Sequence, residues 1–416
     1  MACYKIQSLE SGLGMLRKRD QGYQTLEVFG PEHEYSIIDE QLQPMPIVDQ
    51  IIKKMSGKVT NTVEFSDFAF SKELQLHVAE IKATTPFFSP SVFEETMNQS
   101  VLEISSVLES FDVKLMGLGM HPTLTLDKAK IWEHDDREIY EAYDKIFGLR
   151  QHGWLNIQSY QLNLPYLEEK EAIRLYNAIA NILPYLPAIS ASSPIYESKF
   201  GELVDNRLHF YSINQEKVPS ISGDIIPKYI DSFEAYMEQT IRRYSSDLKK
   251  INAPEVLINK EWVNSRGAII RFDRKAIEIR IMDEQECIKS DVALSCFIRS
   301  LLRGVIEDQE RELSHPQLVD NLHTIIRDGL KAKIHHPKFK SAQGFCRFLF
   351  DVAYESAFKE EKNYLWIIKK RIENGNLSDL ITKRVKRRMQ KTDLTEAIFS
   401  TYSKLAEKLL KNQIFE

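Results

Sequence analysis

The sequence Val28-Phe-Gly-Pro-Glu-His-Glu-Tyr-Ser-Ile37 alternates polar and apolar side chains along most of its length. Successive side chains of a β-strand point to opposite faces of the sheet. Glu32 and Glu34 therefore share one face with Ser36, whereas His33 and Tyr35 lie on the other. We predict a strand within residues 24–38 that has one polar working face and one apolar packed face.

Five further polar signatures follow along the chain, and each is typical of part of a strand or turn. They are Glu80-Ile-Lys-Ala-Thr-Thr-Pro86, Gly117-Leu-Gly-Met-His-Pro122, Gln161-Leu-Asn163, Ala191-Ser-Ser-Pro194 followed by Arg207, and Ile277-Glu-Ile-Arg-Ile-Met-Asp283. Strands lying side by side would bring their carboxylates into one small volume. Carboxylates that lie so near one another without a cation repel and raise each other's pKa. Cations are therefore needed between them. The pattern predicts a site for several metal ions, and the neighbouring arginines predict a bound phosphate.

Each signature also has a simpler interpretation. Glu32 and Glu34 could be solvated acids on an exposed sheet face. Glu278 and Arg280 could form a plain ion pair on a strand, or they could bind a metal and a phosphoryl oxygen respectively. Gln161 and Asn163, which share a face, either contact a nucleotide or amino-acid substrate or belong to an exposed sheet surface.

Two signatures leave the direction of a side chain open. Strict alternation places Glu80 with Leu76 and Val78, away from Glu73. Either a bulge re-aims Glu80, as occurs beside active sites, or Glu80 is not a ligand. His121 is either a metal or substrate ligand or a structural histidine. The sequence also leaves open whether Glu73 or Glu64 is an additional metal ligand.

The bulk properties exclude several classes of protein. The 416 residues carry a formal net charge of -5, so no overall field attracts nucleic acid or an anionic membrane. No apolar run approaches the roughly 18 residues of a membrane helix. Segment 1–20 has no long apolar core, which argues against a signal peptide. The cysteines are far apart and form no CxxC pair, which favours a reducing compartment; they are Cys3, Cys287, Cys296 and Cys346. We therefore predict a cytoplasmic protein.

Two local patterns receive the less specific interpretation. The run Lys383-Arg384-Val-Lys386-Arg387-Arg388 could bind nucleic acid, but it lacks interleaved aromatic residues and is better explained as a solvated helix face. Gly12-Leu-Gly14 lacks the third glycine and the preceding strand of a dinucleotide-binding motif. Since no GxxxxGK[ST] motif is present either, any ATP is held without a phosphate loop of that kind.

The order of the expected elements indicates an α+β fold. Apolar spacing predicts helices over 91–110, 230–250 and 290–308, and a helical stripe from Ala172 to Leu183. Strands are expected over 113–118 and within 255–283, with a turn near Asp273-Arg274. Strands and helices do not alternate regularly, which argues against a doubly wound parallel sheet. Beyond about residue 315 the pattern is helical and charged. We predict a catalytic domain over 1–315 and a helical C-terminal region over 316–416 packed on it.

Taken in order, these segments resemble the glutamate–cysteine ligase type 2 family, the ATP-dependent carboxylate–amine ligases related to glutamine synthetase. The resemblance spans roughly residues 25–290, with a weaker similarity near Asn374-Gly-Asn-Leu377. Gln158-Ser-Tyr-Gln161 stands where many bacterial members have a Gln-His-hydrophobic-His strand, and the spacing of Glu73 and Glu80 also differs. Both departures bear on the identity of the amine acceptor. The matching segments are Gly30 to Glu34, Glu80 with Thr84 or Thr85 and Pro86, Gly119 to Pro122, Gln161 to Leu164, Leu186 to Pro194, Arg207, Arg266-Gly267 and Ile277 to Asp283.

The resemblance implies a curved antiparallel sheet that forms the active site, with helices packed behind it. It implies that Mg²⁺ and ATP convert the side-chain carboxylate of glutamate into an acyl phosphate, which an amine, most simply that of cysteine, then attacks. It assigns the metal ions to Glu32, Glu34, Glu80 and Glu278. Arg207 and Arg280 would act on phosphate or the substrate carboxylate, Arg266 is a weaker candidate for that role, and Gln161, Asn163 and His121 would contact substrate or nucleotide.

Three alternatives remain. The acceptor could be another amino acid or amine, the acids could serve a metal-dependent hydrolase without ATP, or the chain could be a non-catalytic binding protein. The expected partners are small molecules, with neither nucleic acid nor membrane, and a homo-oligomer stays open. We expect Glu32→Ala and Glu278→Ala to lose turnover and remain folded, because each removes one charge from a repelling cluster.

Overall fold

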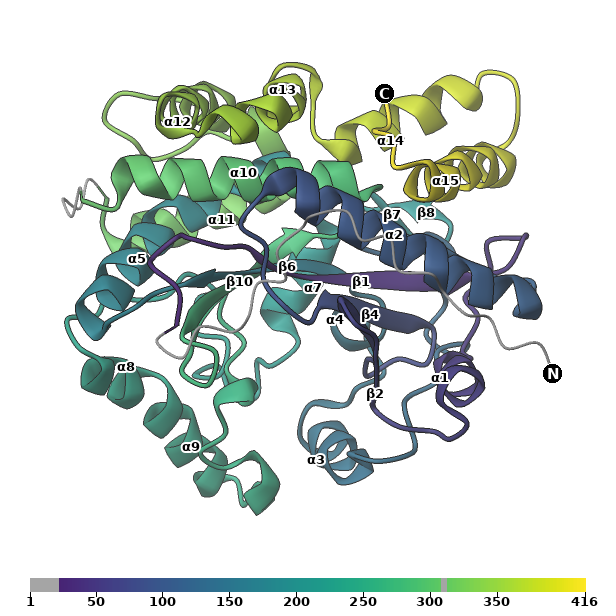
Figure 1. The fold of residues 1–416 in the computed structure, drawn as a ribbon, viewed down its shortest axis with the longest axis horizontal. Helices are drawn as coiled ribbons and strands as arrows, with labels where there is room; N and C mark the ends of the chain where they lie inside the picture. Colours follow the sequence, from purple (N-terminus) through teal and green to yellow (C-terminus); the bar gives the residue numbers. More distant parts are fainter. Residues whose placement is uncertain (1–21, 308–312) are drawn as a thin grey trace.

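The computed structural model describes residues 22–307 and 313–416, and its centre is an antiparallel sheet of eight strands (Figure 1). The strand order is β2-β3-β4-β1-β6-β10-β9, and β5 pairs with β1 near its end. Segment 1–20, with Cys3 and Gly12-Leu-Gly14, lies outside the described residues. The strands of this sheet are β1 Gly30–Ile38, β2 Thr62–Glu64, β3 Phe68–Lys72, β4 Val78–Ala83, β5 Lys114–Met116, β6 Ser159–Pro165, β9 Ala268–Arg271 and β10 Ala276–Asp283, and a separate hairpin is formed by β7 Ile195–Tyr196 and β8 Lys199–Phe200.

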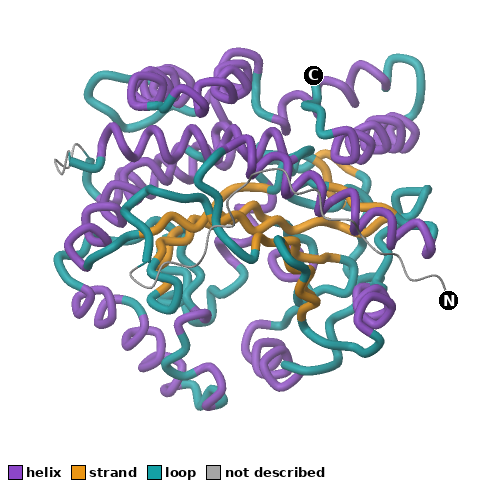
Figure 2. Tube along the Cα trace, in the orientation of Figure 1, coloured by secondary structure: helices purple, strands orange, loops and turns teal. Residues whose placement is uncertain are grey.

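Helices cover one face of the sheet and flank the other. In the view of Figure 1, α2 and α10 lie above the sheet, and α3, α8 and α9 lie below it. Figure 2 shows that the last third of the chain adds mainly helices to the upper side. The α-helices are α1 Val48–Ser56, α2 Pro90–Leu108, α3 Arg137–Phe147, α4 His152–Leu155, α5 Glu169–Ile182, α6 Pro187–Ser190, α7 Asn206–Ile213, α8 Phe233–Gln239, α9 Ile241–Lys250, α10 Ile288–Val305, α11 His315–Asp328, α12 Ala342–Ser356, α13 Lys359–Asn374, α14 Leu377–Arg388 and α15 Leu394–Lys411. Short 3-10 helices are η1 Glu109–Phe111, η2 Leu183–Tyr185, η3 Glu255–Leu257, η4 Glu261–Val263 and η5 Gly329–Lys331.

The hydrophobic core lies between the sheet and the helices above it. His33, Tyr35 and Ile37 are fully buried on the apolar face of β1. The centroid of the Phe93 ring on α2 lies 6.1 Å from the centroid of the His33 ring. The predicted stripe of α2 is buried from Phe93 to Leu108, as the three-and-four spacing indicates. The predicted α+β fold with an antiparallel sheet is thus confirmed.

One stretch of the secondary-structure prediction was wrong. Residues 255–267 are not strand but contain η3 and η4, and the strands begin only at Ala268. Asn252 and Asn259 have φ values of 54°, a left-handed conformation that asparagine tolerates and that interrupts an extended chain. The helix predicted over 230–250 is divided at Thr240, where φ is -119° and ψ is -85°. These turns carry the chain away from the sheet before β9 returns to it.

The C-terminal helices pack onto the rest of the chain. Helix α10 contacts α12 and α13, and α15 contacts β5. The main hydrophobic cluster includes residues from both sides of position 315. The division into units at that position stays a prediction. Among the described residues, no helix is both long and apolar enough to cross a membrane.

Candidate active site

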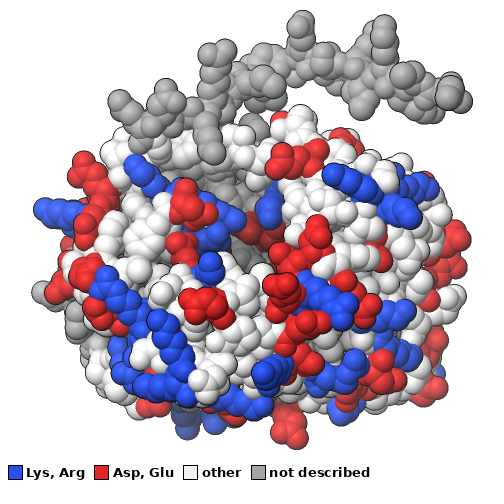
Figure 3. Space-filling view, turned by 90° about the horizontal axis from the view of Figure 1, so that it is seen from below, with Lys and Arg blue, Asp and Glu red and all other residues white. Residues whose placement is uncertain are grey.

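The face of the sheet opposite the core carries the predicted acids. Glu34 pairs with Glu80 across β1 and β4, and Glu32 pairs with Gln161 on β6. Glu278 on β10 pairs with Asn163 on the other side of β6. Because directly opposed residues of an antiparallel pair point to the same face, these side chains share one surface. They line or border a cavity of about 570 Å³. Figure 3 views the molecule from this side and shows acidic and basic residues around a central hollow.

Glu34 lies in the acidic pocket, as we name this cavity, and its hydrogen-bond donors are uncharged. The backbone N–H of Ser159 donates to its Oε2 at 2.7 Å, and the Gln161 amide donates to its Oε1 at 2.9 Å. Burial raises the pKa of Glu34. Gln161, predicted to line the pocket, therefore holds the Glu34 carboxylate in a fixed orientation.

Glu32 is neutralised only in part by its neighbours. Arg274 donates to its Oε1, and the Asn163 amide donates to the same oxygen at 2.9 Å. Burial, followed by the charges of Glu80 and Glu278, raises the pKa of Glu32 from 4.5 to about 7. A group shifted in this way binds a divalent cation in exchange for its proton.

Glu80 faces the acidic pocket because a turn resets the alternation before β4. The N–H of Val78 donates to the Gln75 carbonyl, so β4 begins only after this turn and Glu80 comes to lie opposite Glu34. Lys82 on the same strand forms an ion pair with Glu80. Glu73 also lines the pocket, and burial and then Glu34 and Glu80 raise its pKa well above the usual range. Glu64 is exposed and does not line this pocket.

Glu278 differs from the other acids because arginines occupy both of its oxygens. Arg280 donates to Oε1 through Nε at 3.0 Å and also through Nη2, and Arg271 donates to Oε2. Although burial opposes ionisation, Arg280 and Arg271 lower the pKa of Glu278 to about 2. In this structure Glu278 orients two guanidinium groups at the edge of the acidic pocket. This role comes in addition to the predicted one as a metal ligand, which stays a prediction.

Arg207 lies at the floor of the pocket and is itself held by an acid. Its Nε donates to Asp283 Oδ1 at 2.6 Å, and its Nη2 donates to the carbonyls of Ile281 and Met282. The Ser192 N–H donates to the second oxygen of Asp283 at 2.7 Å. The positive charge of Arg207 thus sits near Glu34, whose ionised form it favours.

Two predicted site residues do not face the acidic pocket. His121 is fully buried, and its Nδ1 accepts hydrogen bonds from the N–H groups of Thr123 and Leu124, so the loop geometry explains it as a structural residue. Arg266 lines a separate cavity of about 1030 Å³, where carbonyls of Ser220 and Ile221 hold its guanidinium group. The predicted substrate-contact role therefore has no support from the acidic pocket at either position, and it stays a prediction.

Sequence reasoning missed four basic residues of the pocket. Lys82 follows Glu80 at the alternate position, so its presence on this face could have been found. Arg271 precedes the predicted turn at Asp273-Arg274 and Arg274 belongs to it, but nothing local indicates that these arginines reach Glu278 and Glu32. Lys72 lines the pocket close to Asp136. Aromatic side chains also line the pocket, and they include Tyr143, Trp154, Tyr211 and Trp262.

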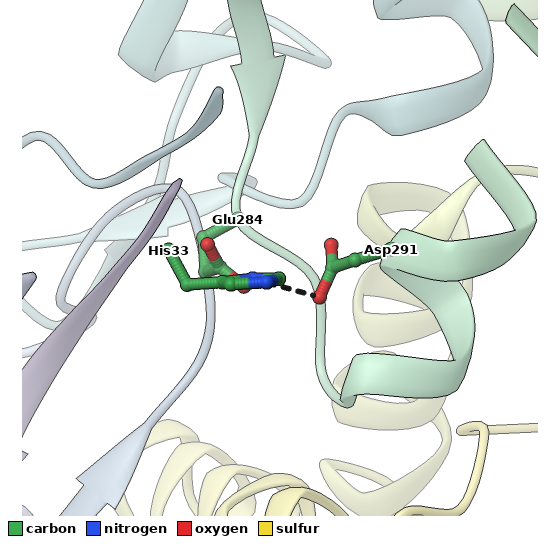
Figure 4. A group of neighbouring side chains, drawn as sticks. All are labelled: His33, Glu284 and Asp291. Carbon is green, nitrogen blue, oxygen red and sulfur yellow. Dashed lines mark hydrogen bonds and ion pairs between the residues drawn. The ribbon is translucent and has the colours of Figure 1, made fainter. Parts of the chain in front are cut away.

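A second charged cluster lies on the core face of β1. His33 Nδ1 is 3.3 Å from Glu284 Oε1 and 3.5 Å from Asp291 Oδ2, and all three residues are fully buried (Figure 4). Glu284 also accepts a hydrogen bond from the backbone N–H of Glu34 at 3.2 Å. Despite burial, which opposes the charge, Glu284 and Asp291 raise the pKa of His33 to about 9. We name this group the buried triad.

The residues of the acidic pocket suit divalent cations. They supply carboxylate and amide oxygens, the hard ligands that Mg²⁺ prefers. Burial, and then the charges of neighbouring acids, raise the pKa of Glu32 and of Glu73, and a bound cation would offset both effects. Together with Arg207, Arg271 and Arg280, the pocket can bring metal ions and an anionic group to one place.

Comparison with known proteins places this arrangement in a family. The model of Glutamate-cysteine ligase family 2 matches residues 28–399. An uncharacterized protein of Archaeoglobus fulgidus is 44% identical over 389 residues, which cover 93% of this chain and all of that protein.

Two solved structures share the fold at low sequence identity. One is a glutamate–cysteine ligase from Francisella tularensis in complex with AMP, with a TM-score of 0.67 and 12% identity, covering 93% of this chain and 90% of that one. The other is a bifunctional glutathione synthetase from Pasteurella multocida, with a TM-score of 0.57 and 14% identity, covering 92% of this chain and 53% of that one.

Proposed function

This chain belongs to glutamate–cysteine ligase family 2 and is an ATP-dependent ligase, and on that premise we propose that it joins the side-chain carboxylate of glutamate to an amine, with cysteine as the leading acceptor. The family match covers nearly the whole sheet and most of the C-terminal helices. The reaction would pass through an acyl phosphate, because a carboxylate needs a leaving group before an amine can displace it. Phosphoryl transfer from ATP supplies that group.

The observation that carries the proposal is the meeting of acids and arginines in one cavity. Glu32, Glu34 and Glu80 approach from β1 and β4, and Arg271 and Arg280 approach from β9 and β10. The reaction brings two anions together, so neutralising their charge is the main task of the protein. The carboxylates from β1 and β4 and the arginines from β9 and β10 supply the opposite charges that this task requires.

The residues divide the work according to their surroundings. Glu32, Glu34 and Glu80 would hold Mg²⁺, while Gln161 and Asn163 fix the directions of the first two carboxylates. When bound, Mg²⁺ would neutralise the phosphate oxygens of ATP and orient the transferred group.

The arginines would act on the anions of the reaction. Glu278 holds the forks of Arg271 and Arg280 toward the pocket, where they would contact the transferred phosphate. Arg207 would bind the phosphate or the carboxylate of the acid substrate. No side chain has to act as a nucleophile, so the buried Cys287, Cys296 and Cys346 need no catalytic role.

The acceptor would bind against the aromatic side chains of the pocket. The rings of Tyr143 and Trp154 are 5.2 Å apart, and Trp262 lies 6.2 Å from Tyr143. Such rings can contact an apolar side chain or attract an ammonium group. They are compatible with cysteine and equally with a larger amine, so the acceptor is the part of the proposal most in need of measurement.

The test is a substrate panel with ADP detection. Purified protein is incubated with Mg²⁺-ATP, one acid and one amine, and ADP and the amide product are measured for each pair. We expect ADP release that requires both substrates, with glutamate as the acid. Glu32→Gln should abolish it, and Glu64→Gln, which changes an exposed acid of the same sheet outside the pocket, should not.

The outcomes separate the proposal from its rivals. Hydrolysis of an amide without ATP would favour the metal-dependent hydrolase. Absence of phosphate release with every pair would favour a binding protein that has kept the fold. A cytoplasmic location and small-molecule partners remain part of the proposal, a homo-oligomer stays open, and the panel tests only the small-molecule substrates.

A further inference from the structure

Arg274 reaches into the acidic pocket from the turn between β9 and β10. Its Nη1 donates to Glu32 Oε1 and lies 4.0 Å from Glu278 Oε2. Glu32 and Glu278 belong to strands that are separated by β6. The guanidinium group therefore bridges two acids from opposite sides of the pocket, with Asn163 beneath it on β6.

The other two arginines of this edge are held more firmly. Arg271 also pairs with Glu261 at 3.1 Å, and Arg280 also donates to the Asn264 carbonyl at 3.3 Å. Their side chains are 17% and 18% exposed, whereas that of Arg274 is 37% exposed. A long, half-exposed side chain on a turn can move at little cost, because the strands that position the acids need not move with it.

The oxygen that Arg274 contacts is one that a metal ion would use. Glu32 Oε1 already accepts from Asn163 at 2.9 Å, and Arg274 takes the side of the carboxylate that faces Glu278. A divalent cation bound at this oxygen of Glu32 would meet the guanidinium charge at close range. Like charges repel strongly in a buried site, so the cation and Arg274 cannot both occupy this position.

We propose that Arg274 is a resident counter-ion that occupies the metal position of Glu32 and moves onto the nucleotide phosphate when a divalent cation takes its place. The inference rests on the proposed function for the metal position at Glu32 and for the identity of the anion. A planar guanidinium group matches phosphate oxygens as well as it matches a carboxylate, so the side chain exchanges one partner for another. Arg274 would then couple metal binding to nucleotide binding.

This exchange has a signature that a purely structural role lacks. Without nucleotide, Arg274 competes with the cation, so its removal strengthens metal binding. With nucleotide, Arg274 contacts the phosphate, so its removal weakens the binding of the metal–nucleotide complex. The effect of one substitution thus changes sign between the two conditions.

The experiment measures Mn²⁺ binding by electron paramagnetic resonance, without nucleotide and with an ATP analogue whose β–γ bridge cannot be hydrolysed. For Arg274→Gln we expect Mn²⁺ affinity to rise about tenfold without the analogue and to fall about tenfold with it, the effect of one charge-assisted hydrogen bond. Lys275→Gln is the matched control, because it removes the same charge from the same turn. It should change neither affinity by more than about twofold.

The second variant and the remaining outcomes complete the test. Arg274→Lys keeps the positive charge but lacks the planar guanidinium group. It should still compete with Mn²⁺ when the analogue is absent, and it should lose most of the contribution of Arg274 to Mn²⁺ binding when the analogue is present. Weaker Mn²⁺ binding by Arg274→Gln in both conditions would overturn the inference and make Arg274 a residue that merely positions Glu32. Equal behaviour of Arg274→Gln and Lys275→Gln would also overturn it. Since these measurements require no turnover, a failed substrate panel would leave the result intact.

Discussion

Strand β1 separates two charged clusters whose residues alternate along the chain. Glu32 and Glu34 point into the acidic pocket, and His33, between them, points into the buried triad with Glu284 and Asp291. The buried triad contains its own cation, since the pKa of His33 is raised to about 9. In the acidic pocket, burial and then neighbouring acids raise the pKa of Glu32 and of Glu73, although Lys82 and Arg274 lie beside them. The buried triad is closed around its own cation, whereas the pocket is open to further cations from solution.

The largest expected effect concerns the buried triad. His33→Leu removes its cation and leaves two buried carboxylates, which should lower the free energy of unfolding by about 3–5 kcal/mol. Chemical denaturation at neutral pH measures this loss. An unchanged unfolding midpoint would mean that the triad does not hold β1 against α10.

The next effect concerns turnover. Glu32→Ala should lower turnover by about 10²–10³-fold, because it removes charge stabilisation at the reacting phosphate. The variant should melt no lower than the wild type in a chelator, since the acidic pocket loses a repelling charge. Glu64→Ala is the control. A folded Glu32→Ala variant with full activity would exclude Glu32 from the site.

Glu278→Ala should behave differently from Glu32→Ala. The sequence-based expectation was that both variants remain folded. In the structure, however, Glu278 neutralises Arg271 and Arg280, so its removal leaves Arg271 with only Glu261 and takes from Arg280 the carboxylate that holds it. We expect a lower melting temperature in chelator for Glu278→Ala than for Glu32→Ala. Equal melting temperatures would mean that Glu278, like Glu32, belongs to one cluster of mutually repelling acids.

The free energy of unfolding should fall with rising pH in two separate pH ranges, which we call the lower and the upper window. The pKa of Glu32 is raised from 4.5 to about 7, so without metal its contribution is lost as the pH rises through that range. The contribution of His33, whose pKa is raised from 6.5 to about 9, is lost between those values. Each amounts to roughly 3 kcal/mol. Unfolding free energy is measured from pH 4.5 to 9.5.

Two variants and one metal assign these windows. Glu32→Gln should remove the lower window, and His33→Leu the upper one. Saturating Mg²⁺ should reverse the slope of the lower window alone, because the metal binds the deprotonated carboxylate. An Mg²⁺ effect confined to the upper window would place the metal in the buried triad.

The smallest expected effect concerns a residue that orients an acid. Gln161→Leu removes the amide that donates to Glu34, and it should weaken Mg²⁺ binding by about 10–100-fold. Isothermal titration measures the affinity. Because Ser159 still donates to the other oxygen of Glu34, the fold should be retained. A loss of folding instead of affinity would make Gln161 a structural residue.

The sequence was sufficient where a property depends on neighbours along one strand. The alternation at Glu32 and Glu34 predicted both the acidic face and the packed face of β1. The spacing of Phe93, Met97 and Val101 predicted α2 and its buried side. The meeting of Glu278 with Glu32 in one pocket was also expected from the alternation of polar and apolar residues in both strands.

Properties that depend on strand order or on turns could not be predicted in this way. Arg274 reaches Glu32 only because β6 lies between β1 and β10 and the hairpin turn extends over it. Glu80 faces the pocket because a turn interrupts the alternation before Val78. His121 and Arg266 carried the expected residue types, but the loops that hold them direct the side chains elsewhere. Glu284 and Asp291 gave no signal that they would meet His33.

The most direct test of the distinction between the two faces of β1 is equilibrium binding of Mn²⁺ to wild-type protein and to the Glu32→Gln and Glu34→Gln double variant without nucleotide. Wild-type protein should bind Mn²⁺, and the double variant should bind it at least about tenfold more weakly, since two hard oxygen ligands lose their charge. Equal binding by the two proteins would contradict the assignment of the cations to this pocket.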